Sequence, residues 1–120
     1  GHTFVIGDKI RRGDRDVEVS LPDLSAYAGL TAVIIDDVIS SGQTILHCID
    51  ALKQQGVKEI KCAAVHGIFA DNVDETLIEV GLTALITTNT IVHSSNAVDI
   101  APLLIDPIVD CLLFIKENQL

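Results

Sequence analysis

The 120-residue sequence contains no tryptophan and no methionine, and its aromatic residues are one tyrosine and three phenylalanines. It is also poor in positive charge, because eight lysines and arginines stand against 17 acidic residues and give a formal net charge of −9. Phosphate backbones select for basic surfaces. The charge balance therefore argues against a general nucleic-acid-binding protein.

Long hydrophobic runs are missing as well. No uninterrupted apolar segment reaches the roughly 20 residues of a membrane-spanning helix, and no charged region followed by an apolar stretch opens the chain. Apolar residues nevertheless make up 48% of the sequence, which is too many for a disordered chain. We expect residues 1–120 to form one soluble, cytoplasmic domain that does not engage a membrane.

The sequence has few cysteines. Cys48, Cys62 and Cys111 are odd in number and lack the close pairing of a disulfide framework or a zinc site. Each falls within an apolar pattern, so we expect reduced, buried side chains that behave as small hydrophobes.

Short β-branched runs alternate with stretches of helical periodicity. The run at 31–35 is continuously apolar, as is typical of a parallel strand covered on both faces. Further strands are expected at 60–65 and 82–87, with a helix after each of the three strands. The last helix is predicted at 107–116, opened by an Asp106-Pro107 cap. This order predicts an α/β fold with a parallel sheet and helices on both faces.

The first 20 residues follow a different pattern. Two strands are predicted at 3–6 and 17–19, flanking a charged, hairpin-like excursion at 7–16. Half of the basic residues of the chain fall in this excursion, namely Lys9, Arg11, Arg12 and Arg15. One interpretation is charge pairing with nearby aspartates on a solvated hairpin. The other is a mobile cationic arm that closes over a polyphosphate.

The segment 33–44 is the most informative in the chain. A strand ends in Asp36 and Asp37, enters the small-residue turn Ser40-Ser41-Gly42, and leads into a helix near Thr44. In open α/β sheets ligands bind beyond the carboxyl ends of the strands. The turn offers backbone N–H groups at a helix N-terminus, together with hydroxyl groups, and this combination suits a phosphate.

The two carboxylates suit a different part of a ligand. Asp36 and Asp37 repel phosphate, but they fit vicinal hydroxyl groups or Mg²⁺ bound to those hydroxyls. An acid pair beside a phosphate-binding turn thus describes a sugar phosphate. The alternative is a strand that ends in solvated acids and an ordinary helix cap. Neither a Walker A motif nor a GxGxxG motif is present.

The stretch Asp36-Asp37-Val38-Ile39-Ser40-Ser41-Gly42-Gln43-Thr44 resembles the phosphoribosyl-diphosphate binding loop of type I phosphoribosyltransferases. Ser41 stands in the place of the usual threonine and keeps its hydroxyl group. Ser40 stands where many members carry an acid, and Gln43 where a second glycine is common. The resemblance implies a parallel-sheet, phosphoribosyltransferase-like domain.

The rest of the chain is similar to one branch of that superfamily, the ribose-phosphate pyrophosphokinases. Segment 8–19 resembles their flexible catalytic loop, and segments 66–70, 89–93 and 94–104 also fit. Carried over by position, Lys9 and Arg11 would contact the phosphates of ATP. Asp36 and Asp37 would hold the ribose hydroxyls, while Ser40, Ser41, Gly42, Gln43 and Thr44 would hold the 5-phosphate.

The resemblance implies transfer of diphosphate from ATP to ribose 5-phosphate. Mg²⁺ would arrive with ATP, and no protein metal site is expected. The family enzyme has two related halves, and this chain resembles most of the second. We therefore expect the chain to need the first half, to be inactive or nearly so alone, and to belong to a homo-oligomer. A functional role for His66 and His93 stays open, whereas His47 is expected to be structural or exposed.

Two other functions remain possible on the sequence. A phosphoribosyltransferase for a nucleobase would use the same loop but needs an aromatic or apolar hood, and Tyr27 is the only aromatic residue in an obvious loop. A non-catalytic regulatory subunit of the pyrophosphokinase would bind the sugar phosphate without turnover. The presence of Lys9 and Arg11 argues against this second alternative.

Overall fold

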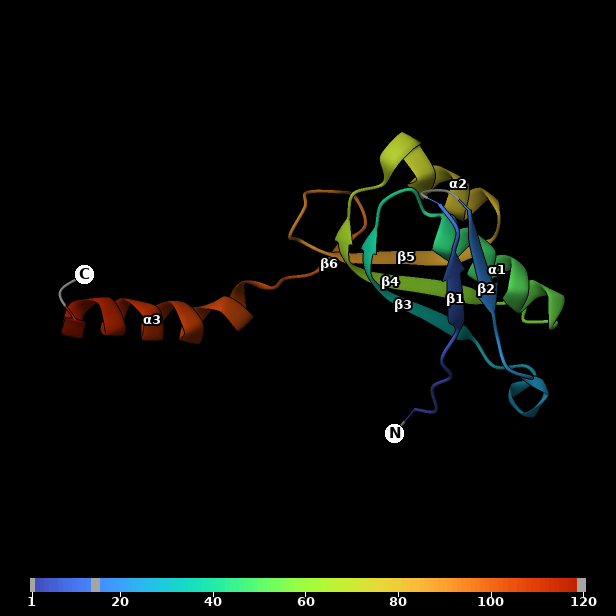
Figure 1. Ribbon diagram of the computed structural model, residues 1–120, viewed down its shortest axis with the longest axis horizontal. Coiled ribbons are helices and arrows are strands. Elements are labelled where there is room, and N and C mark those ends of the chain that lie inside the picture. Colours follow the sequence, from blue (N-terminus) through green and yellow to red (C-terminus); the bar gives the residue numbers. More distant parts are fainter. Residues whose placement is uncertain (1, 14–15, 119–120) are drawn as a thin grey trace.

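The computed structural model describes residues 2–13 and 16–118 and contains two sheets (Figure 1). A small antiparallel sheet pairs β1 (Asp8–Arg11) with β2 (Val17–Ser20). The main sheet is parallel, in the order β3 (Ala32–Ile39), β4 (Ile60–Gly67), β5 (Leu82–Thr88) and β6 (Asn96–Val98). The helices are α1 (Gln43–Gln54), α2 (Val73–Glu79) and α3 (Ala101–Asn118). The predicted parallel α/β fold is confirmed.

One face of the main sheet carries the hydrophobic core. Helix α1 contributes its buried isoleucines and leucine to the same cluster that receives α2. Because successive strand residues point to opposite faces, Ile60, Cys62 and Ala64 of β4 all meet these helices. The helical spacing of Ile45, Ile49 and Leu52 buries one stripe of α1 against them. Both helices therefore lie on one side of the sheet.

The opposite face of the sheet is uncovered, which corrects two expectations. Val33 and Ile35 of β3 are 56% and 80% exposed, so this strand is not buried on both sides. Val65 and Ile86 are exposed in the neighbouring strands. The helices do not cover both faces because the last helix, which could have reached this side, does not pack on the sheet.

Helix α3 stands away from the sheet (Figure 1), and all of its residues are exposed. It begins at Ala101, so the expectation that Asp106-Pro107 opens the helix was wrong and Pro107 lies inside it. Proline cannot donate to the carbonyl of Leu103, but this helix is in water, which can hydrate that carbonyl. The radius of gyration of 18.0 Å exceeds the roughly 14 Å of a compact chain of this length.

The cysteines are free thiols in different surroundings. Cys62 is buried, Cys48 is half-buried and Cys111 on α3 is exposed, so the expectation of three buried side chains was wrong for Cys111. Burial, together with the charge of Asp36, raises the pKa of the Cys62 thiol to about 12. Cys62 therefore behaves as a small apolar side chain.

The N-terminal hairpin is present, but its first strand is β1 rather than the predicted 3–6. The charged segment itself pairs, with Lys9 opposite Val19 and Arg11 opposite Val17. Val17 is buried and β2 packs against α1, which fixes the hairpin to the core. Arg15, one of the four clustered cations, lies outside the described residues. Within the described part of the chain, α3 and the shorter helices all fall short of the length and apolarity needed to cross a membrane.

Candidate functional site

The loop after β3 is shaped by one glycine. β3 ends at Ile39 and α1 begins at Gln43, so residues 40–42 form the strand-to-helix turn at the carboxyl edge of the sheet. Gly42 is the N-cap of α1 with φ of +75°, a left-handed conformation that side chains disfavour. A Cβ atom there would lie 2.4 Å from Cγ2 of Val73. The turn therefore requires glycine on both conformational and steric grounds.

The loop borders a hollow of about 620 Å³ that also receives the hairpin. Strand β1 places its two alternate cations over the end of β3, so residues distant in sequence meet at one site. All of the predicted site residues line the hollow except Gln43, which begins the helix instead. The lining residues are Lys9, Arg11, Asp36, Asp37, Val38, Ile39, Ser40, Ser41, Gly42, Thr44, Ile45 and Ala70.

The two adjacent carboxyl groups have different environments. Asp36 Oδ1 accepts a hydrogen bond of 2.9 Å from the backbone N–H of Asp37, and Asp37 Oδ1 accepts one of 2.8 Å from Val38. Partial burial and the neighbouring Asp37 carboxyl raise the pKa of Asp36. Interaction with the Asp36 side chain and the Val38 hydrogen bond lower the pKa of Asp37. Asp36 is therefore the weaker acid of the pair.

The positive charge of Lys9 reaches both carboxyl groups. Its field favours ionisation and lowers the pKa of each, as the smallest of the causes acting on them. Cations and acids thus face one another across the hollow without forming an ion pair within 4.0 Å among the described residues. This arrangement leaves the charged groups available to a ligand that carries both phosphate and hydroxyl groups.

A segment that residue patterns did not single out supports the loop from behind. The backbone N–H groups of Ile68 and Phe69 donate to the carbonyl of Ile39 at 3.0 and 3.1 Å, and Ala70 donates to Ser40 at 2.9 Å. Ala70 and Ile45 also line the hollow. Only the resemblance at 66–70 pointed to this region, because bonds between loops leave no periodic signal in a sequence.

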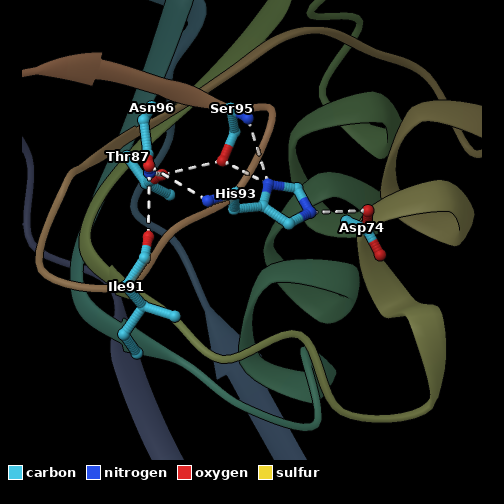
Figure 2. A network of polar contacts seen from close by, with 6 residues as sticks. All are labelled: Asp74, Thr87, Ile91, His93, Ser95 and Asn96. Atoms are coloured by element: carbon cyan, nitrogen blue, oxygen red, sulfur yellow. Dashed lines mark hydrogen bonds and ion pairs between the residues drawn. The ribbon is translucent and has the colours of Figure 1, made fainter.

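The histidines lie near this edge of the sheet. His66 at the end of β4 makes a 2.7 Å contact between Nδ1 and Thr90 Oγ1, and it pairs in register with Val38 of the hollow. His93 contacts Asp74 and Ser95 (Figure 2). His47 is exposed on α1, in agreement with its expected structural or surface role.

The carboxylates of the site fit a metal ion that is bound mainly by its substrate. No group of three or more His, Cys, Asp or Glu side chains within residues 2–13 and 16–118 could hold a metal ion. Mg²⁺ prefers oxygen ligands and commonly keeps waters, using one or two carboxylates together with substrate phosphates. Asp36 and Asp37 provide such a pair, so the donor set suits Mg²⁺ that arrives with a ligand.

The fold and the site define a class of protein. Residues 2–99 match the family model described as "Phosphoribosyl transferase domain". The chain therefore belongs to the phosphoribosyl transferase domain family, in agreement with the resemblance of its β3–α1 loop.

Several curated proteins similar to this chain are ribose-phosphate pyrophosphokinases. The chain is 36% identical over 86 residues to a ribose-phosphate pyrophosphokinase of Sulfurisphaera tokodaii, covering 69% of this chain and 29% of that protein. It is 29% identical over 103 residues to that of Methanothermobacter thermautotrophicus, covering 86% of this chain and 36% of that protein. The predicted similarity to ribose-phosphate pyrophosphokinases is confirmed.

A solved structure agrees with these relatives. The phosphoribosylpyrophosphate synthetase from Mycobacterium smegmatis matches 83% of this chain with a TM-score of 0.64 and 31% sequence identity. The match covers 35% of that chain. This chain thus spans about a third of the length of the relatives it matches.

Proposed function

We propose that this chain provides the ribose 5-phosphate site and the cationic loop of a ribose-phosphate pyrophosphokinase. In this reaction diphosphate passes from ATP to ribose 5-phosphate, giving phosphoribosyl diphosphate and AMP. The observation that carries the proposal is the single hollow lined by Lys9 and Arg11 of the hairpin together with the acid pair and the small-residue turn. The relatives named above support it.

The turn and the acids would bind opposite ends of the sugar phosphate. Backbone N–H groups at the start of α1, with the hydroxyls of Ser40, Ser41 and Thr44, would hold the 5-phosphate, and Gln43 would extend this cradle. Asp36 and Asp37 would accept hydrogen bonds from the ribose hydroxyls, which they can do without facing the phosphate. The sugar is then oriented with its anomeric carbon toward the hairpin.

Lys9 and Arg11 would bind the polyphosphate and stabilise charge in the transition state. The anomeric oxygen of ribose 5-phosphate forms a bond to the β-phosphorus, the bond from that phosphorus to the α-β bridging oxygen breaks, and AMP leaves. The hydroxyl proton passes to solvent. Such transfers depend mainly on positioning and on electrostatic stabilisation, which these residues supply. Mg²⁺ bound with ATP would add charge neutralisation beside Asp36 and Asp37.

The proposal extends to the partners that the site requires. We expect the first half of the enzyme and further copies of the chain to complete the ATP site, and the chain alone to be inactive or nearly so. The uncovered face of the sheet and helix α3 provide apolar surface for such contacts. A nucleobase phosphoribosyltransferase is less well supported, because no aromatic side chain of the described residues lines the hollow.

Calorimetric titration of the chain with ribose 5-phosphate, with and without Mg²⁺, tests the sugar-phosphate site. We expect saturable binding that Asp36→Ala abolishes. Asp50→Ala is the matched control, because Asp50 is an exposed acid on α1 that bonds only Gln54 among the described residues. A folded chain that does not bind ribose 5-phosphate would contradict a preformed site in this chain.

A chimera tests the reaction itself. The segment of the Sulfurisphaera tokodaii enzyme that matches this chain would be replaced by this chain, and AMP formation from ATP and ribose 5-phosphate would be measured. Turnover above that of a chimera carrying Asp36→Ala supports diphosphoryl transfer. Diphosphate release that depends on a nucleobase would favour the transferase, and binding without turnover would favour a regulatory subunit.

A further inference from the structure

The segment between β4 and α2 contacts the turn at residues 40–42, which we call the sugar-phosphate loop, in two ways. The first is the set of backbone hydrogen bonds from Ile68, Phe69 and Ala70 to the end of β3 and to Ser40. The second is the packing of Val73, the first residue of α2, against Gly42. The position of this segment therefore determines the position of the loop.

The segment has a backbone conformation that is uncommon outside glycine, least favoured at the bulky Phe69 and better tolerated by Asp71 and Asn72. Phe69, Asp71 and Asn72 have φ of 53°, 56° and 55°, in the left-handed region, although none of them is glycine. Strained residues of this kind persist only where surrounding contacts determine the conformation. Contacts from elsewhere in the fold must therefore keep residues 69–72 in place.

The ring of Phe69 is one point at which the segment is held. Phe69 is buried, and its ring lies over Gly67, where a Cβ atom would come within 2.4 Å of Cε2. The ring also meets the imidazole of His93, with ring centroids 4.5 Å apart and an interplanar angle of 46°. His93 belongs to the turn between β5 and β6, far along the chain from the loop.

His93 is held in turn by a polar network (Figure 2). Its Nε2 lies 3.0 Å from Oδ2 of Asp74 on α2, and its Nδ1 lies 2.7 Å from Oγ of Ser95. The backbone N–H of Ser95 also donates to Nδ1, at 3.0 Å. An N–H can only donate, so Nδ1 is the acceptor and the proton is assigned to Nε2, which donates to Asp74.

The network extends into the sheet beyond His93. Oγ of Ser95 lies 2.7 Å from Oγ1 of Thr87, a buried residue of β5, and Asn96 donates to Thr87 and to the carbonyl of Ile91. Figure 2 shows His93 between Ser95 on the turn and Asp74 on the helix. The imidazole thus joins α2 to the sheet while its face packs on Phe69.

We propose that His93, paired with Asp74, is a positioning residue for the sugar-phosphate loop. It acts through Phe69 and Val73, which fix the backbone that contacts Ser40 and Gly42. The proposal rests on the proposed function only in naming the ligand that the loop binds. It predicts that breaking the pair loosens the loop and weakens ribose 5-phosphate binding without removing any group that touches the ligand.

The first test does not need the ligand. Amide hydrogen exchange would be followed in the chain and in Asp74→Ala, at Phe69 and Ala70, whose N–H groups donate to Ile39 and Ser40. We expect exchange at these two amides to accelerate by about tenfold or more, while amides in the middle of α1 keep their rates. Unchanged exchange at Phe69 and Ala70 in a folded Asp74→Ala chain would overturn the proposal.

The second test measures the dissociation constant for ribose 5-phosphate by calorimetry. Asp74→Ala should raise it by about tenfold, whereas Asp74→Asn, which can still accept from Nε2, should stay within about twofold. Glu79→Ala is the matched control, since Glu79 is exposed on the same helix and its side chain forms no hydrogen bond or ion pair within the described residues. Ile49→Val, a core change on α1, controls for a general loss of stability.

The outcomes separate the two proposals. If the unaltered chain and Asp74→Ala bind ribose 5-phosphate with equal affinity, the positioning role is refuted and the sugar-phosphate site is still supported. If the unaltered chain does not bind ribose 5-phosphate but Asp74→Ala accelerates exchange at Phe69 and Ala70, the proposed ligand is wrong. The positioning role of His93 and Asp74 is then supported. An Ile49→Val chain that loses affinity as much as Asp74→Ala would show that stability alone explains the effect, and would overturn the positioning role.

Discussion

Asp36 and Asp37 are neighbours in sequence, yet their carboxyl groups have different environments and their pKa values shift in opposite directions. Asp36 belongs to the strand side that faces the core helices, and its charge is felt by the thiols of Cys48 and Cys62. Asp37 is exposed and accepts from the next backbone N–H. One acid is thus partly desolvated and the other hydrated, and the partial burial of Asp36 disfavours its ionised form in the fold.

Asp36→Asn should raise the midpoint of thermal unfolding at pH 7 while abolishing ribose 5-phosphate binding. The folded-state pKa of Asp36 lies above its ordinary value of 3.8, so folding disfavours the ionised form. The stabilisation that protonated Asp36 gives to the fold is fully present below pH 3.8 and is lost as the pH rises through the raised folded-state pKa. The advantage of Asp36→Asn should therefore disappear at about pH 3, where both side chains are neutral. A lower midpoint than the unaltered chain at pH 7 would contradict the argument.

Lys9→Ala and Asp37→Asn should separate turnover from sugar binding in the chimeric enzyme. Under the proposed function Lys9 contacts the polyphosphate, so its loss should lower kcat by about 10²-fold with little change in the KM for ribose 5-phosphate. Under the same proposal Asp37 binds a sugar hydroxyl, so Asp37→Asn should raise that KM by about tenfold. Steady-state kinetics with both substrates varied would check this. Equal rises in KM in the two variants would be inconsistent with the assigned roles.

At the scale of elements, the site depends on how a turn, a helix and a hairpin meet. The β3–α1 turn follows local rules, since a small-residue segment with a left-handed glycine starts a helix beyond the end of a strand. Segment 68–73 contacts this turn, and the hairpin lines the same hollow. Both are contacts between segments that lie far apart in the sequence. The turn can therefore be recognised in the sequence, whereas its stability depends on elements that the sequence does not connect to it.

Gly42→Ala should lower the free energy of unfolding by well over 1 kcal/mol. The left-handed conformation alone costs an alanine about 1 kcal/mol, and overlap with Val73 adds to it. Gly56→Ala is the matched control, because Gly56 has φ of +84° and nothing lies within 4 Å of its added Cβ. Urea unfolding of both variants, and of Gly42→Ala combined with Val73→Ala, would isolate the overlap. Equal losses at the two glycines would mean that Val73 moves aside.

The whole molecule exposes more apolar surface than its fold requires. Helix α3 is apolar on nearly every side, with acids at Asp106, Asp110 and Glu117, and it packs on nothing in the described chain. The open sheet face is apolar as well. Surfaces of this kind on an acidic protein mark contacts with other protein. The homo-oligomer and the contact with another part of the enzyme stay predictions, and these surfaces are where we expect them.

The isolated chain should self-associate through α3. Sedimentation velocity over a range of concentrations should show species larger than the monomer, whereas a chain ending at residue 100 should remain monomeric. Leu112→Lys with Ile105→Lys is a control that keeps the helix length but adds charge to its exposed apolar sides. If the unaltered chain is monomeric at all concentrations, the prediction of self-association through α3 is wrong.

The local features of this protein can be predicted from its amino-acid sequence. The alternation of apolar runs placed three of the four parallel strands, and the acid pair with its small-residue turn identified the candidate loop, because strand and helix periods and turn chemistry depend on neighbours in sequence. Strand β6 was missed, since three residues between polar turns carry too little pattern.

The contacts between residues distant in sequence became apparent from the three-dimensional fold. In the structure the first strand of the hairpin is Asp8–Arg11, one face of the main sheet is uncovered, and Lys9 lines the same hollow as Asp36. His93 also contacts Asp74 and Phe69 behind the loop. These contacts depend on packing and on the geometry of the whole chain rather than on spacing, so no local pattern could have specified them.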